Sequence, residues 1–113
     1  MKVKKEELTN GCLICIAVCA ADGFISEEEE EVLEGEFLNN YEISSETFQI
    51  ILDQYFSSSK NIEDWLETIK DEELQHQILL ISKKAAAIDG LDIAENIVWE
   101  KCNNYWGELV CPE

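Results

Sequence analysis

We predict from the sequence an all-α protein, folded as a compact bundle of about six helices. Apolar residues recur three and four positions apart along most of the chain, which is the spacing of one face of an α-helix. No stretch alternates apolar and polar residues over a convincing length, so no β-sheet is expected. With 113 residues, 46% of them hydrophobic, the chain has the length of one domain, 1–113, and enough apolar surface for a core.

The expected helices follow from this spacing and from caps. The first two span 6–21 and 27–40, and the first is apolar on nearly all sides, which is typical of a central helix. A third begins after a cap at Ser44 or Ser45, and a short fourth follows the polar stretch 57–61. The fifth presents to the core Leu74, Ile78, Ile81, Ala85 and Ile88, and the sixth, 93–106, presents Val98, Cys102 and Tyr105.

The charge of the chain limits its partners. Eight Lys and Arg against 25 Asp and Glu give a net charge of −17. Because nucleic acids and anionic membranes attract basic surfaces, we expect neither partner, and a basic protein partner suits the charge better. The apolar run Cys12–Ala21 is shorter than the ~20 residues of a membrane span. Acidic residues stand between the basic N-terminal residues and this run, which argues against a signal peptide. We therefore expect a cytoplasmic protein.

Three of the five cysteines, Cys12, Cys15 and Cys19, share one stripe of the first helix. This pattern suits burial, and an odd count does not close into disulfide pairs. The alternative is a soft-metal site in which the three thiolates hold zinc. We favour burial, and a buried thiol is inert.

An internal repeat relates the two ends of the chain. An offset of 67 places Leu13 on Leu80, Asp22 on Asp89 and Gly23 on Gly90. In each copy an apolar helix runs into Asp-Gly and an acidic helix follows. We therefore expect a helix–Asp-Gly–helix pseudo-repeat, with the third and fourth helices between its copies.

The loop after each Asp-Gly has a physical logic of its own. Gly23 permits a positive φ where the first helix ends. Ser26 then caps the next helix, with Glu29 three residues on, which is the spacing of a capping box. In the second copy Asp92 is the expected cap and Glu95 stands three residues on, so the second loop is one residue shorter.

The segment AVCAADGFISEEEEEVL, residues 17–33, resembles the signature of the TerB-like domain. This family occurs in bacterial tellurite-resistance proteins and at the front of certain membrane-anchored DnaJ-type co-chaperones. Six positions match its pattern: Ala21, Asp22, Gly23, Ile25, Ser26 and Glu29. The family fold is all-α with a pseudo-repeat and often carries a second Asp-Gly loop, which Asp89 and Gly90 supply here. Ile88 stands where the family usually has Ala, and the second loop lacks one residue.

The resemblance implies a cluster of acids near the Asp-Gly loops that binds a divalent metal. The expected ligands are Asp22, Glu29, Asp89 and Glu95, with Glu28 and Asp92 in reserve. Carboxylate oxygens are the ligands that Ca²⁺ and Mg²⁺ prefer. A single EF-hand does not fit, because it would place Val18 and Ala20 at ligating positions. The alternative is that these residues only end and cap helices, and that Glu27–Glu31 is a solvated helix start or a docking surface.

The resemblance implies a small acidic binding module with a role in the stress response, specifically the response to tellurite. The alternative is a metal-free protein-interaction module, or an acidic decoy that mimics nucleic acid. We expect no enzyme, because no nucleophile motif, phosphate loop or HExxH occurs and the lone His76 reads as an exposed helix residue. We expect the tryptophans to lie mostly in the core. The alternative is that Trp99 and Trp106, seven residues apart on one side of the last helix, form a protein-binding patch if that side is exposed.

Overall fold

The computed structural model describes residues 5–21, 23, 25–58, 61–88 and 93–106. Within these residues it contains helices and no strand, so the predicted all-α bundle is confirmed. The helices are α1 (Lys5–Cys19), α2 (Glu27–Tyr41), α3 (Ser45–Ser57), α4 (Ile62–Leu66), α5 (Glu72–Ala86) and α6 (Ile93–Tyr105). None of the described helices is long and apolar enough to cross a membrane.

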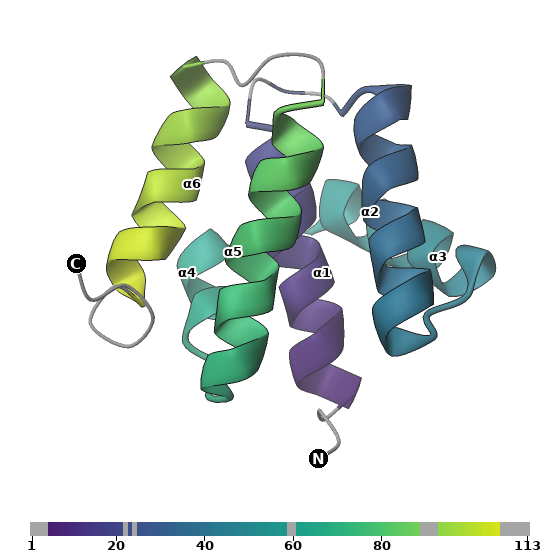
Figure 1. Ribbon diagram of the computed structural model, residues 1–113, viewed down its shortest axis with the longest axis horizontal. Helices are drawn as coiled ribbons and strands as arrows, with labels where there is room; N and C mark the ends of the chain where they lie inside the picture. Colours follow the sequence, from purple (N-terminus) through teal and green to yellow (C-terminus); the bar gives the residue numbers. More distant parts are fainter. Residues whose placement is uncertain (1–4, 22, 24, 59–60, 89–92, 107–113) are drawn as a thin grey trace.

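Helix α1 is the centre of the bundle. It contacts each of the other five helices and packs most extensively on α5. Every residue from Gly11 to Cys19 is buried, as the all-round apolar pattern predicts. In Figure 1, α5 lies in front of α1 and runs in the same direction, with α2 and α6 on either side of this pair.

The close approach of α1 and α5 depends on a glycine. A Cβ atom added at Gly11 would lie 2.6 Å from Cδ1 of Ile78, which is itself fully buried. On the next turn the Cys15 thiol donates a hydrogen bond to the Ile78 carbonyl, at 3.7 Å. The small residue therefore lets the two helices pack closely.

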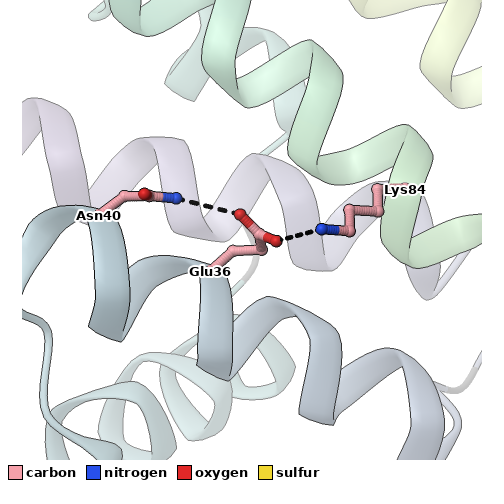
Figure 2. Close-up of polar contacts among 3 residues, drawn as sticks. All are labelled: Glu36, Asn40 and Lys84. Atoms are coloured by element: carbon pink, nitrogen blue, oxygen red, sulfur yellow. Dashed lines mark hydrogen bonds and ion pairs between the residues drawn. The ribbon is translucent and has the colours of Figure 1, made fainter.

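Polar contacts hold α2 against α5 at the surface. The Lys84 ammonium lies 2.5 Å from Oε2 of Glu36, and the Asn40 amide donates to Oε1 of the same carboxylate at 3.0 Å (Figure 2). One carboxylate therefore bridges two helices that are distant in sequence. The side chains are partly exposed, so the ion pair contributes about 0–1 kcal/mol.

The ends of α1 and α5 keep the spacing of the predicted repeat. Both the first and the last residues of the two helices stand 67 positions apart, and the starts of α2 and α6 stand 66 apart. The one-residue difference is the shorter second loop. The internal symmetry of the fold itself stays a prediction.

Two predicted core positions are wrong. Ile88 is 50% exposed because α5 ends at Ala86, so the helical spacing no longer turns the side chain inward. Tyr105 is 50% exposed, and the neighbouring Trp106 is buried in its place.

Candidate functional site

The turn after α1 has the predicted geometry at the residues described. Gly23 adopts a φ of 108°, and its N–H donates to the Ala20 carbonyl at 2.9 Å. A positive φ is costly for a residue with a Cβ, so glycine is the residue that suits this turn. Its exposed Cα has nothing within 4 Å of an added Cβ, so backbone conformation and not space selects the glycine.

A complete capping box begins α2. The Ser26 hydroxyl accepts a hydrogen bond from the Glu29 N–H at 3.1 Å, and Oε1 of Glu29 accepts one from the Ser26 N–H at 3.0 Å. The predicted cap is thus confirmed. It satisfies backbone donors that would otherwise have no partner at the helix start.

Glu29 is buried as well as capped. Only 3% of it is exposed, although it is the third residue of a helix whose first turn is entirely acidic. A carboxylate has about four acceptor positions, and the Ser26 N–H occupies one of them. The geometry leaves further acceptor capacity on an acid held inside the protein.

Glu95 occupies the same place in the other helix pair. It is the third residue of α6 and is 4% exposed, so its carboxylate is also buried. The described residues contain four buried polar or charged side chains, and two of them are these glutamates. The other predicted ligands, Asp22 and Asp89, and the reserve residue Asp92 lie outside the described residues, whereas Glu28 is exposed.

Both glutamates lie at one end of the bundle. Helices α1 and α5 run in the same direction and end there, and α2 and α6 begin there on either side of the pair (Figure 1). The fold thus brings the starts of α2 and α6 to a common end. We call this region the loop end of the bundle.

The exposed acids on α2 also influence one another. Glu27, Glu28 and Glu31 are exposed, and Glu30 is partly buried. Partial burial, reinforced by the charges of Glu34 and Glu27, raises the pKa of Glu30. Burial is thus the larger cause of the shift at Glu30, and the neighbouring acids add to it.

The cysteines of the predicted stripe are buried, and so is Cys102. Cys12, Cys15, Cys19 and Cys102 are each at most 1% exposed. Burial raises the pKa of Cys12 and Cys15, and raises the pKa of Cys102 to about 12. Because the thiolate is the reactive form, these thiols are poor nucleophiles. No group of three or more His, Cys, Asp or Glu in the described part of the chain is arranged to hold a metal.

The two tryptophans considered as a binding patch are not available for one. The Trp106 indole is 2% exposed and donates to the Leu66 carbonyl at 3.2 Å. The Trp99 indole is half-buried, donates to the Leu79 carbonyl at 2.8 Å and lies under the Lys83 ammonium, 4.3 Å from the ring centroid. Both rings contact neighbouring helices, so the side on which they lie does not form an exposed patch. Trp106 is in the core, as predicted, and Trp99 is half-buried. His76 is exposed on its helix, as predicted.

No pattern in the sequence pointed to a hollow of about 280 Å³ that the structure places beside the first Asp-Gly turn. It is lined by Ala20, Gly23, Tyr55, Phe56, Ser58 and Trp65. Aromatic side chains at helical spacing, such as Tyr55 and Trp65, predict core positions and not a hollow. Only the fold shows that an exposed ring, Phe56, stands beside them.

No protein-family model, curated protein or solved structure matches the chain. The TerB-like assignment therefore rests on the motif in residues 17–33 and stays a prediction.

Proposed function

We propose that this protein is a small acidic binding module of the TerB-like kind that takes up a divalent cation, Ca²⁺ or Mg²⁺, at the loop end of the bundle. The observation that carries the proposal is the burial of Glu29 and Glu95 at matching positions of α2 and α6. Burying a carboxylate is unfavourable unless charge or hydrogen bonds compensate. Glu29 already accepts a hydrogen bond from the Ser26 N–H, and a cation would add to this stabilisation in a chain of net charge −17.

Two further ligands are proposed from the sequence. Asp22 and Asp89 precede these glutamates in the loops that lead into α2 and α6. Four carboxylates offer up to eight oxygens, which covers the six to eight that Ca²⁺ takes. Asp22 and Glu29 would form one half of the site, and Asp89 and Glu95 the other.

The biological role proposed with this site is in the stress response, as the resemblance to tellurite-resistance proteins suggests. The exposed acids at the start of α2 would contact a basic protein partner.

Thermal unfolding and calorimetry with Ca²⁺, Mg²⁺ and Mn²⁺ test this proposal. We expect the wild-type protein to be stabilised by at least one of these ions beyond the effect of NaCl at equal ionic strength. The double variant Asp22→Asn/Asp89→Asn should lose that response. No response in the wild-type protein contradicts the proposal.

The matched control is Glu72→Gln/Glu73→Gln. These two exposed acids begin α5, at the end of the bundle opposite the loop end (Figure 1). The control removes the same charge, so its cation response should equal that of the wild-type protein. An equal loss of the response in both double variants would mean that the ions stabilise the protein only through its net charge. That result would contradict the proposed site.

A further inference from the structure

The hollow beside the first Asp-Gly turn is a candidate for a second binding site. Three aromatic residues from two helices line it: Tyr55 and Phe56 at the end of α3, and Trp65 in α4. The ring centroids of Tyr55 and Phe56 are 5.0 Å apart in an edge-to-face arrangement, and those of Tyr55 and Trp65 are 5.9 Å apart. We call this set of side chains the aromatic hollow.

The aromatic hollow is open to solvent on one side. Phe56 is 53% exposed and Trp65 is 5% exposed, so solvent reaches the Phe56 side chain and hardly reaches that of Trp65. Its volume of about 280 Å³ is roughly that of nine waters in the liquid, at about 30 Å³ each. A ligand with several heavy atoms can therefore enter and contact more than one ring.

The electrostatics of the aromatic hollow favour a cation. Helix α3 ends at Ser57 and α1 ends at Cys19, and residues at or just past both ends line the hollow. A helix C-terminus carries a partial negative charge, and neither helix has a basic residue in its last turn to neutralise it. Aromatic ring faces are negative as well. The whole chain adds a long-range negative field.

We propose that the aromatic hollow binds a small quaternary ammonium cation of the choline type. Such a cation is bulky, apolar on its outside and weakly hydrated, so aromatic faces bind it better than they bind a metal ion. The ligand differs from the divalent cation of the proposed function in chemistry and in the residues that hold it. Neither proposal requires the other.

A nuclear magnetic resonance titration with choline chloride tests this second site, in the presence of EDTA and against NaCl at equal ionic strength. We expect saturable shifts of the Gly23, Phe56 and Ser58 amides and of the Trp65 indole N–H. The uncharged isostere 3,3-dimethylbutan-1-ol, which has the same shape, should bind several-fold more weakly. Equal binding of the two compounds, or no saturable shift with choline, overturns the proposal.

Two variants connect binding to the rings. Phe56→Leu keeps an apolar side chain but removes the ring, and should weaken choline binding about threefold to tenfold. Ile50→Ala is the control, because Ile50 is 65% exposed on the same helix and does not line the hollow. Both sites are exposed, so both variants should fold. Unchanged choline affinity in Phe56→Leu contradicts a role for the ring.

Discussion

Ser26 and Glu29 form a reciprocal pair of hydrogen bonds at the start of α2. Their reciprocal hydrogen bonds fix the first turn of the helix and hold the Glu29 carboxylate inside the protein. The cap therefore positions an acid that the cation proposal requires. Glutamine at position 29 can make the same hydrogen bond without the charge.

This arrangement predicts different costs for two serine substitutions. Ser26→Ala should lower the free energy of unfolding by about 1 kcal/mol, because the Glu29 N–H loses its acceptor. Ser45→Ala, at the first residue of α3 where Ser44 provides the cap, should change it by less than about 0.5 kcal/mol. Urea denaturation of both variants checks this. Equal losses would contradict the role of the cap.

The buried thiols predict a loss of stability in alkaline solution. The ordinary pKa of a cysteine thiol is 9.0, and burial raises the pKa of Cys102 to about 12 in the folded protein. Above pH 9 the unfolded chain releases this proton and the folded chain does not, so stability falls as pH rises. Between pH 9 and 10 the expected loss is about 1 kcal/mol for each such thiol.

Urea denaturation at pH 8, 9 and 10 measures this slope. Cys102→Ala should show a shallower decline than the wild-type protein, even though the substitution lowers stability at every pH. Parallel declines in the two proteins would show that the thiol of Cys102 does not contribute.

Among the helices, two glycines should differ in how a substitution by alanine changes stability. Gly11 lies where α1 packs closely on α5, and Gly35 lies in α2 with open space around it. Gly35→Ala in α2 should raise the free energy of unfolding by about 0.5–1 kcal/mol, because an added Cβ meets nothing within 4 Å. Gly11→Ala should be less stable than Gly35→Ala by about 1–3 kcal/mol, because its Cβ overlaps Ile78.

A double-mutant cycle connects the effect to Ile78. Ile78→Val removes the Cδ1 atom that lies closest to the added methyl group, so the Gly11→Ala/Ile78→Val protein should lose less stability than the two single variants together. Additive losses would place the cause of the Gly11 effect elsewhere.

The helices were predictable because their signals are local. Apolar spacing, the serine caps at 26 and 44 and the acidic starts of α2 and α5 are all read within a few residues. The exposure of Ile88 could not be predicted in this way, because it depends on α5 ending two residues before it, at Ala86. The position of the Trp99 ring depends on its hydrogen bond to a carbonyl group 20 residues away, which no local pattern reveals.

At the scale of the whole molecule, the charge of −17 opposes folding through repulsion among the acids. Among the described residues, Lys84 and Lys101 already form ion pairs, with Glu36 and Glu63. Monovalent salt should therefore raise the midpoint of thermal unfolding as it screens the remaining acids. A midpoint that is constant or falls between about 10 and 300 mM NaCl would contradict this.

The sequence located the glutamates of the candidate site but not the depth at which they lie. A capping box predicts that Glu29 bends back toward Ser26, and it does not predict 3% exposure. Burial depends on the assembly of the helices, in which α2 packs on α5 and α1, and not on the sequence around Glu29 alone. The aromatic hollow likewise needs α1, α3 and α4 together, so it could not be read from any one segment.

Nuclear magnetic resonance mapping with CaCl₂ or MgCl₂, against NaCl at equal ionic strength, is the sharpest test of the proposed divalent-cation site at the loop end of the bundle. If the site exists, we expect saturable shifts that include the amides of Gly23, Glu29 and Glu95 together. Shifts confined to the exposed acids of α2, or the same pattern with NaCl, would contradict it.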